Sequence, residues 1–185
     1  MILVWILLAI ALIIIIAFIV YYNRFAVLGN RIDNSLSQID VQLKRRADLI
    51  PNLVESVKGY MKHETNAIKA VTEARKALIA AKDLTKRVKA DQGLESALKT
   101  IFALAENYPD LKANTTFLEL QRELTTTEDK VAYSRQFYND SILTYNNLCK
   151  TFPGSFFAGI YGKKFREYLQ IAEAERKPIK VSFSE

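Results

Sequence analysis

The sequence predicts an all-α protein in which an N-terminal transmembrane helix leads into an antiparallel four-helix bundle. Two observations predict this fold class. The chain of 185 residues begins with an apolar run long enough to cross a bilayer. Beyond that run, apolar residues recur at spacings of three, four and seven, which is typical of helices that bury one face. We expect three regions: an anchor at residues 1–23, a helical bundle at 24–151, and a C-terminal Gly/aromatic turn, short helix and tail at 152–185.

The expected anchor is the run ILVWILLAIALIIIIAFIVYY, residues 2–22, which has no charged residue and no Gly, Pro, Asn or Asp. A bilayer core about 30 Å thick needs roughly 20 such residues in a helix. Trp5, Tyr21 and Tyr22 stand near the two ends of the run, where amphipathic rings favour the membrane interface. A cleaved signal peptide is the alternative, but it has a basic start, a shorter apolar core and a small-x-small cleavage site. We therefore expect a retained single-pass anchor.

Basic residues follow the span and predict its orientation, because basic flanks stay in the cytoplasm. The N-terminus is therefore expected outside and the remainder of the chain in the cytoplasm. Residues 24–82 hold 11 Lys or Arg and 6 Asp or Glu, a net charge of +5, which favours anionic headgroups. Nucleic acid is not expected as a partner, since only one run of three basic residues occurs and no zinc or RNP pattern accompanies it. The candidate lipid or partner contacts in this region are Arg24, Arg31, Lys44, Arg45 and Arg46.

The first part of the bundle carries one continuous apolar stripe. Pro51 lacks an N–H and kinks or ends a helix, whereas Gly59 favours a helix end. The stripe keeps its phase across both residues, so the sequence leaves open which of them is the break. Its members are Leu28, Ile32, Leu36, Ile39, Leu43, Ile50, Val54, Val57, Met61, Ile68, Val71 and Leu78.

Two more helices are expected to complete the bundle. The first covers about residues 92–107, after a polar stretch. A turn with Pro109 as breaker follows, and Asn114 or Thr115 is expected to cap a long helix that runs to about residue 150.

The C-terminal region begins with TFPGSFFAGIYG, whose proline and three glycines predict a tight, apolar turn. Phe156, Phe157 and Tyr161 are too apolar for a freely solvated loop. They are expected to cap the bundle end or to contact the bilayer or a partner. A short amphipathic helix is expected near residues 163–174. The tail that follows alternates apolar residues at Ile179, Val181 and Phe183.

The stretch RQFYNDSILTYNN repeats Tyr-Asn seven residues apart. Seven residues are two helical turns, so Tyr138 and Tyr145 share a face, as do Asn139 and Asn146. The tyrosines continue the apolar stripe and are expected in the core. The asparagines lie at its edge, where an amide needs a partner and an asparagine at a helix seam fixes register. We predict that these residues specify how the helix docks on its neighbours; a ligand cleft is the alternative.

The sequence contains no recognisable catalytic, cofactor-binding or metal-ligating motif. His63 is the only histidine, and in HETNA Ala67 stands where the zinc protease motif needs its second histidine. GSFFAGIYGKK has the glycine spacing of a P-loop, but Ile160 stands where the lysine must be. Cys149 is the only cysteine, so no intrachain disulfide can form. We therefore expect no catalytic residues, no cofactor and no metal.

Several stretches of the sequence resemble the bacterial LemA family. They are QIDVQLKRRADLIPNLVESVKGYMKHE, YPDLKANTTFLELQRELTTTED, SRQFYNDSILTYNN and FPGSFFAGIYGKKFREYL, in this order between about residues 22 and 183. The resemblance implies a single-pass protein of the bacterial inner membrane with a small antiparallel four-helix bundle. It implies no known reaction and supplies no catalytic residues.

These observations favour a non-enzymatic, membrane-anchored scaffold or adaptor. We expect it to self-associate as a homo-oligomer or to bind other membrane or cytoplasmic proteins at the cytoplasmic face. The alternative is a regulatory or sensory module that relays a signal through the bundle, since a helix pair with a proline kink could be bistable. An enzyme is the least favoured hypothesis, because the groups that a reaction needs are missing.

Overall fold

The computed structural model describes residues 1–169, and within this range the chain forms six helices and no strand. The predicted all-α class is confirmed for this part of the chain. The helices are α1 (Ile2–Lys58), α2 (Thr65–Ala80), α3 (Leu84–Ala105), α4 (Pro109–Lys112), α5 (Thr115–Lys150) and α6 (Gly154–Ile160).

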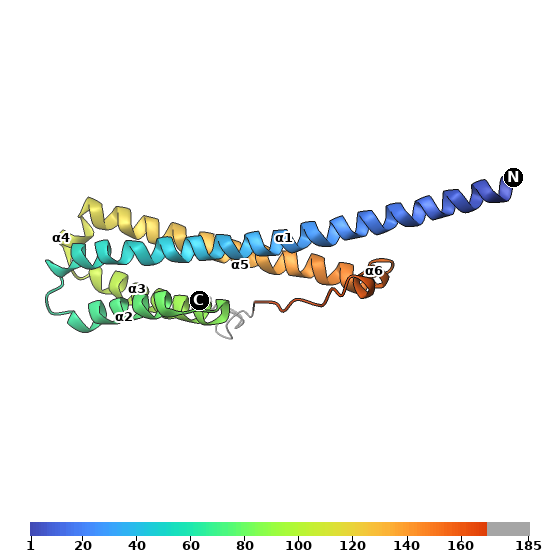
Figure 1. The fold of residues 1–185 in the computed structure, drawn as a ribbon. Coiled ribbons are helices and arrows are strands. Elements are labelled where there is room, and N and C mark those ends of the chain that lie inside the picture. Colours follow the sequence, from blue (N-terminus) through green and yellow to red (C-terminus); the bar gives the residue numbers. More distant parts are fainter. Residues whose placement is uncertain (170–185) are drawn as a thin grey trace, which may run out of the picture.

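The molecule is elongated, and α1 runs along its full length (Figure 1). α5 lies antiparallel to α1, and the α2–α3 hairpin covers the half of this pair that is farther from the N-terminus. In that half, apolar side chains of α1, α2, α3 and α5 share one core. Nearer the N-terminus a second cluster joins α1 only to α5 and α6. The first turns of α1 extend beyond all other helices.

The predicted apolar stripe faces both apolar clusters, with Leu28 and Ile32 in the one nearer the N-terminus. Leu36, Val54 and Ile68 are half-buried, and every other member of the stripe is buried. Each fully buried Leu, Ile or Val contributes about 1.5–3 kcal/mol relative to the exposed side chain. The stripe therefore supplies much of the free energy that holds α1 against α2 and α5.

The break that the sequence left open lies at Gly59, because α1 continues through Pro51 and ends at Lys58. A proline inside a helix leaves the carbonyl four residues earlier without its usual N–H donor. That carbonyl belongs to Ala47, and it accepts a hydrogen bond from Nε of Arg75 on α2 at 2.8 Å. A neighbouring helix thus supplies the missing donor, and α1 passes the proline without ending.

The start of α3 differs from the prediction. α3 begins at Leu84 rather than near residue 92, because the Asp83 carboxylate caps it by accepting from the Lys86 N–H at 2.8 Å. The cap of α5 is as expected, since the Asn114 side chain accepts from the Phe117 N–H at 3.0 Å.

The C-terminal region departs most from the prediction. The apolar stretch expected to be a turn forms α6, and residues 163–169 are extended where an amphipathic helix was expected near 163–174. The helix ends because Gly162 has φ +63° and the Lys163 N–H reaches the Ala158 carbonyl at 2.9 Å, a Schellman motif. Residues 170–174 and the apolar tail lie outside the described residues.

Candidate functional site

The apolar start of α1 stands free of the rest of the protein. Among residues 1–169, α1 is the one helix long and apolar enough to cross a membrane, and its most apolar window is not buried. Trp5 and Tyr22 are exposed and Tyr21 is half-buried, at the two ends where interfacial rings were expected. The helix then continues without a break into the core. An exposed apolar surface of this length fits a lipid environment.

An aromatic junction, made of Phe18, Tyr21, Phe25, Phe157 and Tyr161, joins the end of this span to α6. Phe157 stacks on Tyr21 with ring centroids 4.5 Å apart and meets Phe18 edge-on at 5.1 Å. The Tyr161 hydroxyl donates to the Phe18 carbonyl oxygen at 2.7 Å. Aromatic pairs of this kind contribute about 0.5–1.5 kcal/mol each beyond the area they bury. The junction therefore attaches α6 firmly to the last turns of the span.

The junction separates the three residues that were predicted to contact lipid or a partner. Phe156 is exposed, but Phe157 is buried and Tyr161 is half-buried. The Phe157 ring is enclosed by four aromatic side chains of this chain and has little surface left for lipid or another protein: Phe18, Tyr21, Phe156 and Tyr161. Of the two alternatives that the sequence left open for this residue, packing against the end of the bundle agrees with its burial, and contact with lipid or a partner does not.

The two tyrosines of the Tyr-Asn repeat lie where α5 faces its neighbours. Tyr145 is buried, and its ring meets Phe25 of α1 edge-on at 5.9 Å. Tyr138 is half-buried and packs against both apolar clusters.

The two asparagines hold residues 163–169, which we call the C-terminal strap. Asn146 donates to the Arg166 carbonyl oxygen and accepts from the Arg166 N–H, both at 2.9 Å. Asn139 makes the same pair of bonds with Leu169, at 3.1 and 2.9 Å. The partners of both amides are thus backbone groups of the strap, where the sequence reasoning expected a seam between helices.

We call Asn139 and Asn146 with their four hydrogen bonds the asparagine clamp. The distance between the two asparagines along the helix matches the distance between their partners along the extended strap. Seven residues of helix advance about 10.5 Å, and three residues of extended chain advance about 10 Å. Asn139 and Asn146 therefore face Arg166 and Leu169 in register. Each asparagine amide hydrogen-bonds both the backbone N–H and the backbone C=O of one strap residue. In a helix or a sheet, these groups would instead pair with other backbone groups.

Replacing Asn139 and Asn146 together with alanine is expected to release the strap while leaving α5 folded. Four hydrogen bonds disappear, each with a net contribution of about 0.5–1.5 kcal/mol. Hydrogen exchange of the Arg166 and Leu169 amides, measured by mass spectrometry on the full-length protein, should accelerate at least tenfold. Asn147→Ala is the matched control, because its side-chain amide makes no hydrogen bond within residues 1–169. Equal exchange in both variants would contradict the clamp.

The basic residues after the span do not form one surface. Arg46 has 1% of its surface exposed, so its assignment to a lipid or partner contact was wrong. Arg45 is exposed and pairs with Glu123 through both carboxylate oxygens at 3.0 Å. Lys44 is exposed, but it lies 22 residues beyond Tyr22, about 33 Å along the helix. That is several times the Debye length of about 8 Å, so the charge of Lys44 would be largely screened from headgroups at the level of Tyr22.

Nearer the span, Arg24 and Arg31 are both exposed. Arg24 comes two residues after Tyr22 and is the first charged residue after the apolar run. The Arg31 guanidinium lies over the Phe137 ring at 5.1 Å, so part of its surface is engaged by α5. Of the five predicted basic contacts, Arg24 is thus the one best placed to meet lipid.

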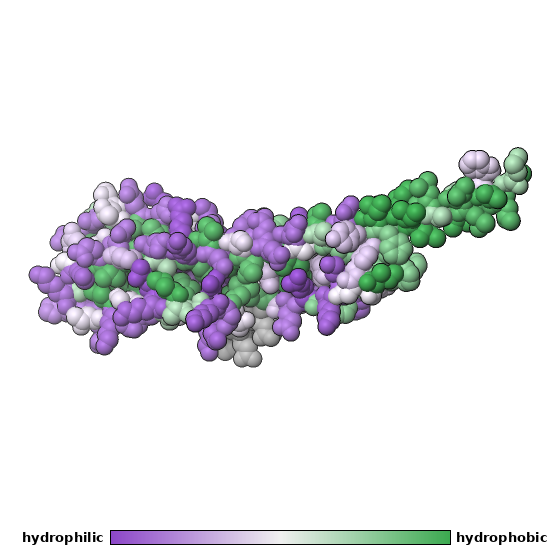
Figure 2. Space-filling view, viewed as in Figure 1, coloured by the Kyte–Doolittle hydropathy of each residue, from purple (hydrophilic) through white to green (hydrophobic). Residues whose placement is uncertain are grey.

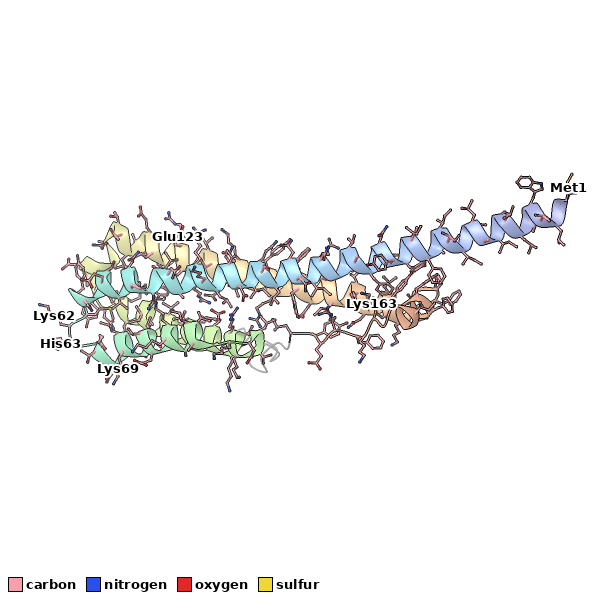
Figure 3. All side chains as sticks on the ribbon, in the orientation of Figure 1. Met1, Lys62, His63, Lys69, Glu123 and Lys163 are labelled. Atoms are coloured by element: carbon pink, nitrogen blue, oxygen red, sulfur yellow. The ribbon has the colours of Figure 1, made fainter. Side chains whose placement is uncertain are left out.

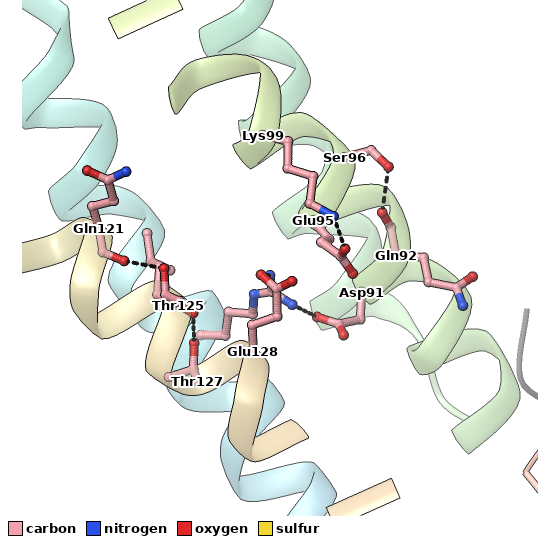
Figure 4. Close-up of polar contacts among 11 residues, drawn as sticks. Asp91, Gln92, Glu95, Ser96, Lys99, Gln121, Thr125, Thr127 and Glu128 are labelled. Carbon is pink, nitrogen blue, oxygen red and sulfur yellow. Dashed lines mark hydrogen bonds and ion pairs between the residues drawn. The ribbon is translucent and has the colours of Figure 1, made fainter. Parts of the chain in front are cut away.

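Arg46 forms a buried ionic centre with Asp91 of α3 and Glu128 of α5. Its Nη1 lies 2.9 Å from Asp91 Oδ1 and its Nη2 lies 3.1 Å from Glu128 Oε2. The two carboxylates approach from facing helices (Figure 4). This centre was not predicted from the sequence. Arg46 nevertheless lies at helical spacing between two members of the apolar stripe, three residues after Leu43 and four before Ile50.

Burial dominates the electrostatics of the ionic centre. It raises the pKa of the Asp91 carboxyl above its ordinary 3.8, against the opposing influence of the Arg46 charge. Burial, followed by the nearby Glu95 carboxylate, raises the pKa of Glu128 as well. The arrangement ties α1, α3 and α5 together at one level, but nothing about it resembles a nucleophile with its base.

The remaining candidates of the sequence reasoning are dispersed. His63 lies in the exposed turn after α1, at the opposite end of the molecule from Met1 (Figure 3). Within residues 1–169, no group of three or more His, Cys, Asp or Glu could hold a metal ion. A shallow surface hollow of about 450 Å³ lies between α1, α2 and the start of α3, lined by Leu43, Lys44, Leu78 and Ile79 among others.

Comparison with known proteins identifies the family. A model of the LemA family matches residues 35–183, which is most of the chain. The chain belongs to the LemA family. The match begins beyond the apolar run and contains the ionic centre, the asparagine clamp and the strap.

Relatives of this LemA-family chain include MamQ proteins and a protein LemA. It is 26% identical over 184 residues to the magnetosome protein MamQ of Magnetospirillum gryphiswaldense, covering 85% of this chain and 68% of MamQ. Paramagnetospirillum magneticum has two MamQ proteins that match to the same extent. Protein LemA of Metamycoplasma hominis is 28% identical over 124 residues, covering 66% of this chain and 57% of that protein. Membership of this family, the MamQ relatives and the free apolar helix together indicate a membrane-associated helical protein.

Proposed function

We propose that this LemA-family protein is a non-enzymatic scaffold that holds a helical bundle, rigidly joined to its anchor, above the cytoplasmic face of the membrane. There it self-associates or binds other proteins. The observation that carries the proposal is the continuity of α1, which is at once the candidate span and a central helix of the bundle.

A continuous helix fixes the position of the bundle relative to the membrane anchor. The 57 residues of α1 extend for about 86 Å at a rise of about 1.5 Å per residue. If about 30 Å of that length crosses the bilayer, more than 50 Å projects from it as part of the bundle. A flexible linker would let the bundle rotate about its anchor, whereas α1 and the aromatic junction restrain that rotation. A rigid projecting rod suits a protein that arranges partners in space.

The chemistry of the bundle supports a structural role. The carboxyl groups whose pKa burial raises, Asp91 and Glu128, lie between helices in the ionic centre rather than in an open cleft. Burial also raises the pKa of the Cys149 thiol, which keeps it protonated and unreactive.

A sensory module was the alternative because of the proline in α1. The Arg75 side chain donates to the carbonyl that Pro51 leaves free, and this hydrogen bond supports a continuous α1. This observation favours the scaffold over the sensory module.

Self-association is expected to produce a homogeneous assembly when the full-length protein is extracted from membranes in a mild detergent. Native mass spectrometry measures the mass of the particle and identifies any bound protein. A discrete oligomer, or a stoichiometric complex with another protein, supports the scaffold. A monomer that stays alone across a tenfold range of concentration contradicts it.

Orientation is tested on the same protein with single cysteines in a Cys149→Ser background. His63→Cys, at the far end of the bundle, should react with a membrane-impermeant maleimide only after the cells are permeabilised. Met1 lies at the opposite end, and Ile2→Cys should react in intact cells. The reverse pattern would place the bundle outside.

A further inference from the structure

α6 has two faces with different surroundings. One face, with Phe157 and Ala158, packs on α1 through the aromatic junction. On the other face, Phe156 and Ile160 are four residues apart and are 58% and 51% exposed. Phe152, two residues before the helix, is 86% exposed. We call these three exposed apolar residues the α6 ridge. Exposed apolar groups gathered in this way mark an interaction surface.

The depth of α6 relative to the span identifies what the ridge meets. Tyr161 bonds to the Phe18 carbonyl oxygen, so α6 lies at the level of Phe18. Phe18 is 16 residues beyond Ile2, about 24 Å along the helix, while the hydrocarbon core is about 30 Å thick. With Ile2 at the outer boundary of the hydrocarbon core, α6 lies about 6 Å below the inner boundary between hydrocarbon and headgroups. Interfacial helices insert their apolar faces about 5–10 Å into this boundary.

Surface continuity points to the same partner. The strongly apolar surface of the span continues onto the α6 end of the molecule, whereas the bundle beyond it is mostly hydrophilic (Figure 2). A protein docked on the ridge would have to share this level with lipid tails on the adjoining surface of α1.

The charge around the ridge complements an anionic leaflet. Residues 141–166 contain no Asp or Glu. They contain four basic residues that flank α6, namely Lys150, Lys163, Lys164 and Arg166. Lysines beside an apolar ridge can reach up to phosphate groups while the ridge inserts below them.

We propose that α6 is a second membrane contact, an interfacial foot that inserts Phe152, Phe156 and Ile160 into the headgroup–acyl boundary of an anionic bilayer. It rests on α1 crossing the bilayer, but not on the scaffold role. One span alone leaves a helix free to tilt and to rotate about its own axis. A second membrane contact to one side of the span restrains both tilt and rotation. It therefore determines which faces of the bundle are turned sideways, where neighbouring membrane proteins lie.

The test is fluorescence quenching by brominated lipids in the full-length protein. Vesicles contain phosphatidylcholine and phosphatidylglycerol at about three to one, with bromine high on the acyl chain. Phe156→Trp and, separately, Phe152→Trp are made in a Trp5→Phe background. The control is Tyr133→Trp, an exposed aromatic residue 17 positions before Lys150 on α5, about 25 Å farther from the foot.

The tryptophans at 152 and 156 are expected to be quenched at least threefold more than the one at 133. Replacing phosphatidylglycerol with phosphatidylcholine should reduce this difference. Native Trp5 in the unsubstituted protein reports whether the span itself is inserted. If Trp5 is quenched and the α6 tryptophans are not, the foot is overturned while the anchor stands. Accessibility of the α6 tryptophans to aqueous iodide means that the ridge faces water. Shielding from both quenchers means that a protein covers it, and either result overturns the foot.

Discussion

Replacing Arg46 with methionine is expected to lower the free energy of unfolding by about 3–5 kcal/mol, the range for removing one partner of a buried ion pair. Asp91 is 3% exposed and would lose its ion-pair and hydrogen-bond partner, leaving the weaker electrostatic influence of Arg135. Arg45→Met is the matched control, since its exposed pair with Glu123 contributes about 0–1 kcal/mol. Urea unfolding of the full-length protein in detergent micelles, followed by circular dichroism, measures both variants.

A double variant separates lost charge balance from lost packing. In Arg46→Met with Asp91→Leu, no buried charge is left alone at that position, and stability should return most of the way to the original value. If the double variant is as unstable as Arg46→Met, then the loss of stability comes from the packing of the Arg46 side chain and not from its charge. Equal losses in Arg46→Met and Arg45→Met would contradict the ionic centre altogether.

The decrease in the free energy of unfolding caused by Arg46→Met should also depend on pH. The pKa of Asp91 is raised in the folded protein, so folding favours the protonated form, and the contribution of this group to stability falls as pH rises from 3.8 through the folded pKa. Removing Arg46 removes the stronger of the two cations that oppose this rise, the other being Arg135, and the pKa of Asp91 should climb further. The variant should therefore be closest to the unsubstituted protein in acid and farthest from it at neutral pH.

Replacing Gly154 with alanine is expected to detach α6 from its position. An added Cβ would overlap the Leu148 carbonyl oxygen and lie 2.9 Å from Leu148 Cδ1, because the start of α6 approaches the last turns of α5 very closely. A carbonyl of the helix backbone cannot move aside as a flexible side chain can. Overpacking of this kind costs about 1–3 kcal/mol, and the aromatic junction would be lost with the position of α6.

The matched control for this substitution lies in the same helix. An added Cβ at Gly159 meets nothing within 4 Å, and alanine is favoured over glycine in a helix by about 1 kcal/mol. Hydrogen exchange across residues 152–162 should increase in Gly154→Ala and stay equal or decrease in Gly159→Ala. Gly154→Ala should also weaken the quenching of a tryptophan at 156. Identical exchange in the two alanine variants would contradict the close approach.

Much of the fold follows from the periodicity of the sequence. The apolar stripe marked which face of α1 and α2 is buried, and the Asn114 cap marked where α5 begins. These features are local, since a helix expresses its amphipathic pattern and its caps within a few residues. Tyr145 was placed in the core for the same reason, and it is buried there.

The candidate site was less predictable because its chemistry joins distant parts of the chain. Asn139 and Asn146 were expected to bond across a helix seam, but their partners are backbone groups 20 and 30 residues away in the strap. An extended segment held by side chains has no periodicity of its own to reveal it. Arg46 looked like one member of a basic triplet, although its place within the apolar stripe was a signal that it is buried.

Composition and spacing alone predicted the apolar N-terminal run, the helical class and the buried stripe, because each depends on residues close together in the chain. Contacts between distant residues settled the rest. Arg75 allows α1 to pass Pro51, Asp91 and Glu128 make burial of Arg46 possible, and the asparagine clamp keeps the strap extended. In each case a backbone or charged group needs a partner, and only the folded chain brings that partner within hydrogen-bonding distance.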